Sequence, residues 1–460
     1  MNTYSNNNTS AAQSPPRHPQ FATLDPIEKN ISDKETATPL AMSLKSKADE
    51  LISQAVEARR VPAFGAVSLD KSGEVLYEGA FGTTGDMNDG ESHSPFTTTT
   101  QINIWSMTKL VTSVAILQLL ETGQLGSLDD DAAKYVPDIG KLPVLQGWTS
   151  DDEVTGHPIT RPATKTITIR HLLTHTSGIA YDFSNRDTCR WFAWRQRTQG
   201  IPRTNRKQSD ISPPLVFEPG TSWAYGYNTD WLGLVVEAIT GIDLETYFQQ
   251  HILGPLGLNQ TGQATRIKVQ SLAHMRSATD RSLALPPMQV DLTTSYGEKD
   301  EKEIQTWGGA FLVSTLRDYA TFLLTILNHG THPTKHVQIL KAETVRDYLF
   351  TDQLPLILGP QASKDAGVGE WDTSIAWMCA NGVFMPENPK GFSTGLMLNL
   401  ADCPGARKTH SGAWAGISNQ YYWVDPQSGK LGVVAANIFP FMDVETLDLF
   451  DRFEKLVYQH

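Results

Sequence analysis

The sequence predicts an α/β (α+β) fold in which one antiparallel sheet is built from both ends of the chain. Strand-like runs at 63–69 and 75–81 lie near the N-terminus, and similar runs at 420–424 and 431–438 lie near the C-terminus. Helical patterns dominate the residues between these two pairs. Strands at both ends and helices in the middle therefore predict a single sheet, flanked by helices, with an all-helical inserted region.

The elements at the two ends are indicated by the spacing of their apolar residues. This spacing is helical over 41–60 and again over 444–458, which predicts an amphipathic helix at each end. The first two strands are joined by Asp-Lys-Ser-Gly at 70–73, a sequence suited to a hairpin turn. In the middle region, Thr168 and Asp243 are residue types that cap the N-termini of helices, and we expect a helix to begin after each.

The domain organisation follows from composition. Residues 1–39 are rich in Asn, Ser, Thr, Gln and Pro and lack an apolar core, so we expect a disordered polar tail. Residues 40–460 are then a single domain. We expect its sheet region at about 40–105 and 305–460, and its helical region at about 106–304.

Charge and cysteine content limit the function classes. A formal net charge of −12 argues against nucleic acid or an anionic membrane surface as the main partner. The three cysteines are far apart in the sequence, which favours a reducing compartment over a disulfide framework. No apolar run approaches the roughly 18 residues of a membrane span, so a soluble, cytoplasmic protein is expected. Motifs for zinc or a nucleotide phosphate are also lacking, and we predict no metal and no cofactor.

Chemistry is concentrated at the start of the helical pattern that follows Trp105. Ser106 and Lys109 lie three residues apart, so on a helix they share one face. The residues after them are apolar on almost every side, which predicts a buried central helix. Ser-x-x-Lys occurs by chance in many helices, but a lysine within an apolar helix is costly unless it is paired. A buried lysine with a lowered pKa can act as the base that a serine nucleophile needs.

Four separated stretches resemble the motifs of the serine β-lactamase-related superfamily. They are Ser106–Lys109, Leu172–Gly178, Pro219–Tyr225 and His410–Gly416. Within that superfamily the chain is similar to fungal lovastatin-type transesterases, which move a small acyl group from a carrier-bound thioester to a hydroxyl of a polyketide. The matching segments are Trp223–Gly226 with Asp230-Trp231, Trp414–Gly416 with Asn419, and Phe439–Asp443.

The resemblance implies a β-lactamase/transpeptidase-like fold and assigns roles to individual residues. Tyr225 becomes the third catalytic residue, relaying the proton of Ser106 while Lys109 lies nearby. The backbone N–H groups of Ser106 and Ala413 become the oxyanion hole, in a strand where the small residue Gly412 lets an acyl group approach. Substrate contacts are also expected from Trp414, in the same motif.

Two positions depart from the penicillin-recognising pattern. His410 stands where those enzymes usually carry a lysine that holds the drug's carboxylate, and a neutral histidine holds it less well. Tyr227 stands where they carry an asparagine, and Asn228 follows one residue later. We therefore expect His410 and Tyr227 in the substrate site, and ester or thioester substrates rather than β-lactams. His175 is expected to be structural rather than a base.

The sequence thus predicts an acyltransferase that works through an acyl group on Ser106. The donor would be a thioester on a carrier protein or coenzyme A, and the acceptor a hydroxyl of a polyketide-like secondary metabolite. A serine hydrolase of metabolite esters would use the same residues, with water as the acceptor. A non-catalytic binding protein of the same fold is the third alternative. The resemblance implies a monomer or weak dimer.

Overall fold

The computed structural model describes residues 43–85, 93–201, 208–264, 266–276 and 306–460, the last range without 372, 374, 377, 381, 386 and 387. All of them belong to one compact unit of the chain, Met42–His460. The disordered tail predicted at 1–39 lies outside the described residues.

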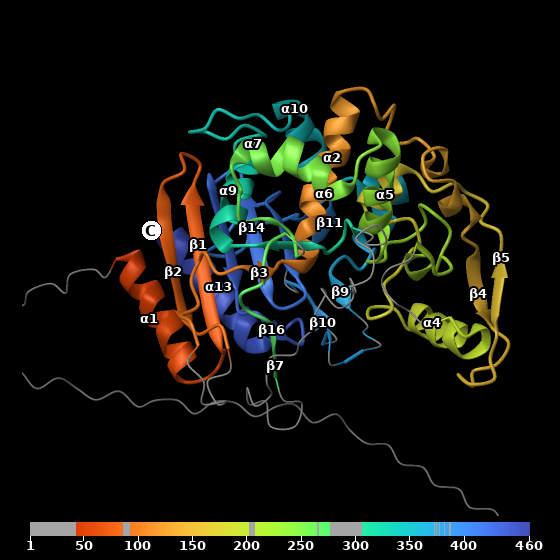
Figure 1. The fold of residues 1–460 in the computed structure, drawn as a ribbon, viewed down its shortest axis with the longest axis horizontal. Helices are drawn as coiled ribbons and strands as arrows, with labels where there is room; N and C mark the ends of the chain where they lie inside the picture. The colour runs from red at the N-terminus through yellow and green to blue at the C-terminus, as the bar shows by residue number, and fades with distance from the viewer. Residues whose placement is uncertain are drawn as a thin grey trace, which may run out of the picture. The chain divides into compact units, whose positions relative to one another are not determined.

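A seven-stranded antiparallel sheet forms the centre of this unit (Figure 1). Its strand order is β11-β12-β13-β14-β15-β1-β2. The strands are β1 (Ala63–Asp70), β2 (Val75–Gly82), β11 (Lys390–Phe392), β12 (Met397–Asn399), β13 (Gly412–Gly416), β14 (Gln420–Asp425) and β15 (Lys430–Ala435). The N-terminal hairpin joins the C-terminal strands where β1 pairs with β15. The predicted sheet from both chain ends is therefore confirmed.

Helices cover both faces of the sheet. Successive residues of a strand point to opposite faces, so neighbouring residues of β14 contact different helices. Trp423 of β14 packs against Phe450 and Phe453 of α13 (Val444–Gln459). Its neighbour Tyr422 packs on the other face against Tyr319 of α9 (Leu316–Leu327). The first helix, α1 (Leu44–Glu57), lies against β2 and α13.

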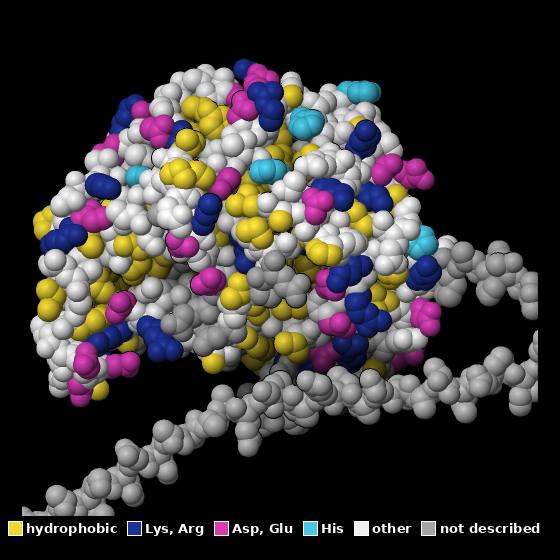
Figure 2. Space-filling model, turned by 180° about the vertical axis from the view of Figure 1, so that it is seen from behind, with side chains coloured by type: hydrophobic (Ala, Val, Ile, Leu, Met, Phe, Trp, Pro, Cys, Tyr) yellow, Lys and Arg dark blue, Asp and Glu magenta, His cyan; other side chains and the backbone are white. Residues whose placement is uncertain are grey.

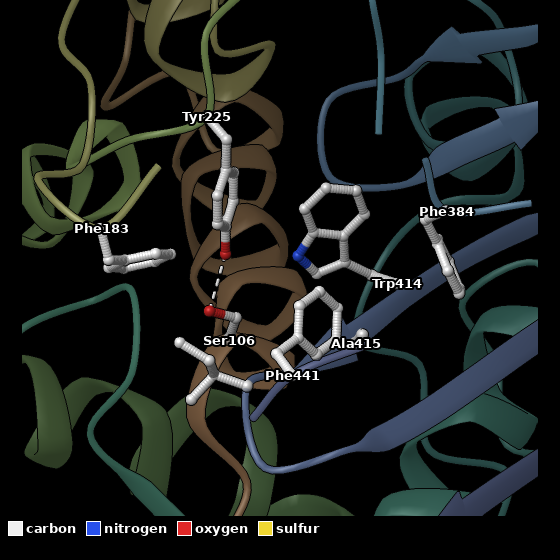
Figure 3. A pocket seen from close by; sticks show the side chains of 8 residues that line it. Ser106, Phe183, Tyr225, Phe384, Trp414, Ala415 and Phe441 are labelled. Atoms are coloured by element: carbon white, nitrogen blue, oxygen red, sulfur yellow. Dashed lines mark hydrogen bonds between the residues drawn. The ribbon is translucent and has the colours of Figure 1, made fainter. Parts of the chain in front are cut away.

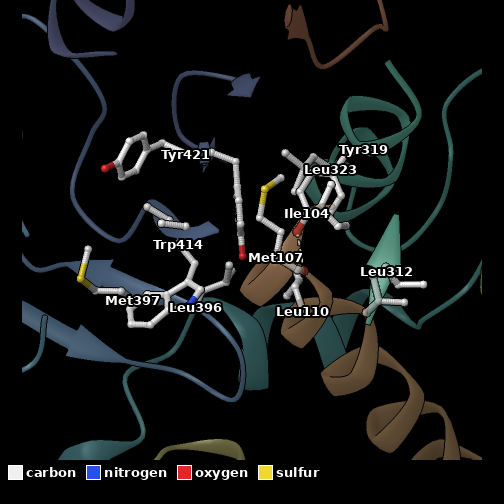
Figure 4. Packing of buried hydrophobic residues seen from close by; sticks show 14 of the residues in the cluster. Ile104, Met107, Leu110, Leu312, Tyr319, Leu323, Leu396, Met397, Trp414 and Tyr421 are labelled. Atoms are coloured by element: carbon white, nitrogen blue, oxygen red, sulfur yellow. Dashed lines mark hydrogen bonds between the residues drawn. The ribbon is translucent and has the colours of Figure 1, made fainter. Parts of the chain in front are cut away.

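The central helix runs through the middle of the core. A 3-10 turn, η1 (Trp105–Met107), leads into α2 (Thr108–Glu121), and all but three residues of α2 are buried, as its apolar sequence predicts. Figure 4 shows Met107 and Leu110 among side chains from β12, β13 and α9. On another side α2 packs against α5 (Asn228–Thr240).

The inserted region is mainly helical but also contains a hairpin that the sequence did not predict. Its helices include α3 (Ile169–Leu173), α4 (Arg186–Gln199), α5, α6 (Leu244–Phe248) and α7 (Gly254–Leu256). Thr168 and Asp243 cap α3 and α6 as expected. The added hairpin pairs β4 (Val144–Trp148) with β5 (Pro158–Arg161). Its strands are short and partly exposed, so they lack the apolar alternation that indicates a strand.

A small sheet holds the chain just before the central helix. It has the order β3-β8-β6, with β3 (Ile102–Asn103), β8 (Leu312–Ser314) and β6 (Gly262–Gln263). The other short elements are β7 (His274–Met275), β9 (Glu370–Trp371), β10 (Gly382–Val383), β16 (Ile438–Phe439), α10 (Ala342–Thr344), α11 (Leu354–Leu358), α12 (Pro360–Lys364), the 3-10 turns η2 (Ala132–Lys134), η3 (Pro137–Lys141) and η4 (Gln208–Ile211), and the π-turns η5 (Gln249–Leu253) and η7 (Val345–Leu349).

The surface carries charges of both signs. On the face shown in Figure 2, acidic and basic side chains are interspersed with apolar ones. Across the described residues, none of the helices combines the length and the apolar character needed to cross a membrane.

Candidate active site

Ser106 lies in the 3-10 turn that begins the central helix. The residue before it, Trp105, has a φ of 48°, a left-handed backbone conformation that is uncommon for residues other than glycine. Its indole Nε1–H donates to Oγ of Ser418 at 2.9 Å, and its ring packs edge-on against Phe439. These contacts fix the sharp turn from which the side chain of Ser106 projects.

Lys109 is buried one turn after Ser106, with 3% of its surface exposed. Its Nζ donates to Oγ of Ser106 at 3.2 Å, to the hydroxyl of Tyr181 at 2.9 Å and to the carbonyl of Gly309 at 2.9 Å. The three acceptors match the three N–H groups of an ammonium. The shared helix face predicted for the serine and the lysine is thus present.

Tyr225 approaches Ser106 from the opposite side of the site. Its hydroxyl donates to Oγ of Ser106 at 2.7 Å, as Figure 3 shows. Its carbonyl accepts a hydrogen bond from the backbone N–H of Tyr181 at 3.1 Å. Its ring contacts His175 on one side and Trp414 on another. The structure therefore brings together the three residues that the sequence assigned to catalysis.

Two buried residues that the sequence analysis did not assign stand behind Lys109. Asp230, in the first turn of α5, accepts from the hydroxyl of Tyr181 at 3.2 Å and from the N–H of Gly309 at 3.0 Å. Burial raises the pKa of the Asp230 carboxyl, and the positive charge of Lys109 opposes this effect. Burial also raises the pKa of Tyr181 well above its usual value, so its hydroxyl stays protonated.

His175 supports the site through a hydrogen-bonding contact and through packing. Its Nδ1 lies 3.0 Å from Nδ2 of Asn228, which also donates to the carbonyl of Ile179. Burial, with a smaller contribution from Lys109, lowers the pKa of His175 well below its usual value. The ring is therefore neutral and packs against Tyr225. Its structural role agrees with the sequence-based expectation.

A mostly apolar cavity opens onto Ser106. Figure 3 shows Phe183, Trp414 and Phe384 around the Ser106–Tyr225 pair, with Phe441 close to the serine. The lining residues are Ser106, Phe183, Tyr225, Phe384, Trp414, Ala415, Ile417 and Phe441. Hydrocarbon walls beside a serine hydroxyl suit the acyl chain of an ester or thioester.

The strand that borders the cavity places Ala415, rather than Ala413, beside Ser106. The carbonyl of Ser411 accepts from the N–H of Asn399 in β12, and backbone groups two residues apart point to the same edge of a strand. Ala413 faces that edge where Met397 of β12 still pairs with it. Ala415 faces the same edge beyond the end of β12, and it lines the cavity.

Of the other residues expected around the substrate, one lines the cavity and the others do not. Trp414 lines the cavity. Gly412 does not: a Cβ atom there would come within 2.5 Å of Leu396, so packing within the sheet accounts for the glycine. His410 is an exposed residue in the turn before β13, away from the cavity lining. The position of His410 corrects the expectation that it contacts the substrate.

Tyr227 also lies outside the cavity lining. Its hydroxyl donates to the buried carboxylate of Asp182 at 2.8 Å, and its ring packs against Tyr181 with centroids 4.3 Å apart. It therefore supports the Tyr181 ring rather than the substrate, which corrects the second expectation. The following residue, Asn228, is committed to His175 and the loop after it.

Metal ligands were also sought among the acidic, histidine and cysteine side chains. Within the ranges that the structure describes, no three of these side chains come together in a way that could hold a metal ion.

A serine held between a buried lysine and a tyrosine is the arrangement of a serine enzyme. The sequence model of the Beta-lactamase family matches residues 48–453, and the chain belongs to that family.

Its relatives include both transferases and an esterase. Monacolin J acid methylbutanoyltransferase of Aspergillus terreus is 30% identical over 411 residues, which cover 88% of this chain and 93% of that enzyme. The lovastatin esterase of Penicillium rubens is 28% identical over 425 residues, covering 89% and 98%. The structure of a mutant simvastatin synthase from Aspergillus terreus superposes with a TM-score of 0.75 and 27% identity, covering 92% of this chain and 99% of that one.

Proposed function

We propose that the protein is an acyltransferase that moves an acyl group from a thioester or ester to a small-molecule hydroxyl through an acyl group on Ser106. The observation that carries this proposal is the Ser106 hydroxyl held by Lys109 and Tyr225 at the mouth of an apolar cavity. The transferases among the relatives support the same reaction class.

In the first half-reaction the Oγ of Ser106 attacks the carbonyl carbon of the donor. Its proton passes to the Tyr225–Lys109 pair, in which either the phenol or the ammonium has already lost a proton, and a bond forms between Oγ and the acyl carbon. The oxyanion would be bound by the N–H of Ser106, in the first turn of the helix, and by an N–H of the β13 edge at Ala415 or just beyond it. Collapse breaks the carbon–sulfur bond, and the leaving thiolate takes the proton back.

In the second half-reaction an acceptor hydroxyl replaces the leaving thiol. Tyr225 takes its proton as the new carbon–oxygen bond forms, and the Oγ of Ser106 leaves and recovers a proton from the same tyrosine. The donor and the acceptor use one site in turn, so ping-pong kinetics are expected.

The apolar lining favours an alcohol over water as the acceptor. Of the eight lining residues, only Ser106, Tyr225 and Trp414 have polar side-chain groups. Lys109 already directs hydrogen bonds to Tyr181, Gly309 and Ser106. A hydrolytic water would therefore find few groups to orient it, whereas an apolar acceptor skeleton would bury its surface against the aromatic walls.

The substrates are proposed from the relatives as well as the cavity. The Aspergillus terreus relative is a monacolin J acid methylbutanoyltransferase. By analogy we propose a polyketide-like secondary metabolite as the acceptor here, and a short acyl thioester on a carrier protein or coenzyme A as the donor. We also propose that the protein is a monomer or weak dimer and that it acts in the cytoplasm.

Hydrolysis of a metabolite ester is the second candidate function. The lovastatin esterase matches 89% of this chain, slightly more than the 88% that the transferase matches. The two reactions share the acyl-enzyme and differ only in the acceptor, so the same experiment separates them.

Intact-mass spectrometry of the protein with short acyl thioesters, with and without candidate alcohols, tests the proposal. We expect a mass gain equal to the acyl group, lost when Ser106 is changed to Ala, that an alcohol discharges faster than buffer does. Equal discharge in buffer alone would establish the esterase. Failure to form any acyl-enzyme, together with failure of Ser106 to react with a fluorophosphonate, would indicate the non-catalytic binding protein.

A further inference from the structure

Asp230 contacts both of the protein groups that hold Lys109. Its Oδ2 accepts from the hydroxyl of Tyr181, and its Oδ1 accepts from the N–H of Gly309. Tyr181 and Gly309 in turn accept from Nζ of Lys109 through the hydroxyl oxygen and the carbonyl. One carboxylate therefore fixes the two acceptors that position the catalytic lysine.

The hydrogen bonds alone fit two protonation states of Lys109. An ammonium would donate to Tyr181, Gly309 and Ser106, whereas a neutral amine would donate to the first two and aim its lone pair at Ser106. In the first state another group must take the proton of Ser106. In the second state the lysine itself is the base.

The surroundings of Asp230 decide between these states. Asp230 is 3% exposed, and burial raises the pKa of its carboxyl. Both of its oxygens accept hydrogen bonds, and these bonds together with the charge of Lys109 oppose that rise and favour the ionised form. A buried anion needs a nearby cation, and Lys109, which is equally buried, lies directly behind Tyr181 and Gly309. The first turn of α5, where Asp230 sits, also favours a negative charge.

The other groups that face Lys109 agree with a positive charge. Its Nζ lies 5.1 Å and 4.9 Å from the ring centroids of Tyr181 and Tyr225, distances at which aromatic rings attract a cation. His175 is neutral and so adds no competing positive charge. Ser106 and the Gly309 carbonyl present oxygen acceptors.

We infer that Asp230 is a positioning residue that keeps Lys109 an ammonium through Tyr181 and Gly309. The proton of Ser106 then passes to Tyr225, which accepts it in its phenolate form. This inference rests on the proposed function only in taking Ser106 as the nucleophile. It extends the site to a carboxylate that does not reach the substrate cavity lining.

A fluorophosphonate measures the activation of Ser106 without any natural substrate. Oγ of Ser106 forms a bond to phosphorus, fluoride leaves, and the serine proton passes to the base of the site. The labelling rate would be measured by intact mass between pH 5 and pH 11 for the wild type and Asp230→Asn. This result is independent of which acyl donor or acceptor the enzyme uses, so failure of the proposed substrates would not affect it.

In Asp230→Asn we expect slower labelling and an alkaline limb of the rate profile that moves to lower pH by about one unit or more. The reason is that an ammonium that loses its buried counter-ion gives up its proton more readily. If Lys109 were instead the base, the acidic limb would move to lower pH and the rate near neutrality would hold or rise. That result, or an equal loss of rate at every pH, would overturn the inference.

Two further variants separate charge from shape. Asp182→Asn is the matched control, because Asp182 is also a buried carboxylate that accepts from a tyrosine hydroxyl, that of Tyr227. We expect its rate profile to keep both limbs in place. Asp230→Glu keeps the charge, so its alkaline limb should stay near that of the wild type even where the larger side chain lowers the rate. A shift in Asp182→Asn, or the same shift in Asp230→Glu as in Asp230→Asn, would contradict the inference.

Discussion

The hydroxyl of Tyr225 lies 2.7 Å from Oγ of Ser106, although 119 positions separate them in the sequence. The strained turn at Trp105 fixes the position of Ser106, and a backbone hydrogen bond to Tyr181 fixes that of Tyr225. The Tyr225 ring is independently packed against His175 and Trp414. The phenol oxygen can therefore be removed without moving the ring.

The change Tyr225→Phe should lower the rate of Ser106 acylation by about 10²- to 10⁴-fold, the usual effect of losing a general acid–base group. The melting temperature should change little, because the packing of the ring is kept. Stopped acylation reactions followed by intact mass give the rate, and thermal unfolding gives the stability.

Tyr227→Phe is the control for this substitution. Its hydroxyl also bonds to a buried partner, Asp182, but lies outside the cavity lining. We expect it to reduce stability while leaving acylation within a few-fold of the wild type. Equal losses of acylation in the two variants would remove Tyr225 from the proton path.

The nucleophile could be found from the sequence because its signal is local. The spacing of Ser106 and Lys109 puts both on one helix face, and the apolar residues around them make that helix a buried one. Tyr225 could be assigned only through the resemblance of its motif to a known family. Nothing in the spacing alone places it 2.7 Å from the serine.

The errors and omissions have physical causes that no local pattern reveals. The backbone groups of Ala413 and Ala415 point to the same edge of β13. Pairing with β12 covers this edge at Ala413 and ends before Ala415, so the length of β12 decides which residue faces the substrate. Tyr181 contacts Lys109, and Asp230 contacts Tyr181, only through the long-range packing of α5 and the loop before α4. His410 was misplaced because its motif begins in the turn before the strand rather than within it.

Asp443 should contribute more to the free energy of unfolding than a helix N-cap usually does. It caps α13 through Thr446 and also accepts from the guanidinium of Arg276, with both partners almost fully buried. Asp443→Ala removes the carboxylate that pairs with this buried cation, so we expect a loss of about 3–5 kcal/mol in the free energy of unfolding. Urea denaturation measures it.

Asp243→Ala is the matched control, because Asp243 is also a helix N-cap but is not paired with a buried arginine in the described structure. Asp243 caps α6 and accepts from the backbone and hydroxyl of Thr246, the same arrangement that Asp443 has with Thr446. Its loss should cost about 1 kcal/mol, the usual contribution of an N-cap. Similar costs for Asp243 and Asp443 would show that the ion pair with Arg276 adds nothing.

His171 should make the protein less stable in mild acid. It forms a capping box with Thr168, and burial lowers its pKa to about 4 from an ordinary value of 6.5. The unfolded chain therefore binds a proton below pH 6.5 that the folded chain refuses until about pH 4, so stability falls across this window as the pH is lowered. The loss from pH 7 to pH 5 is about 2 kcal/mol for this one group.

His171→Gln isolates that contribution, because glutamine at the same helix position can keep the capping box but does not titrate. Urea unfolding of both proteins at pH 7 and pH 5 should show a smaller acid loss in the variant. A constant difference between the two proteins across this range would mean that His171 does not link stability to pH.

The cavity walls should decide which acyl groups are accepted. Phe384 lines the cavity and is stacked on Tyr421, so Phe384→Leu enlarges the space beside Ser106. We expect the variant to shift acylation toward longer chains, by about tenfold or more in the ratio of rates for a long and a short thioester. Competition between acyl thioesters of different length, followed by intact mass, measures this ratio directly.

The same substitution at Phe392 distinguishes cavity size from general loosening of the core. Phe392 is as buried as Phe384 and packs edge-on against Trp414, but it is not part of the cavity lining. Phe392→Leu should therefore lower stability through lost packing while leaving the ratio of acyl preferences unchanged. If both variants altered the ratio alike, chain length would be set by the rigidity of the site, and the aromatic wall at Phe384 would have no special part in selecting the acyl group.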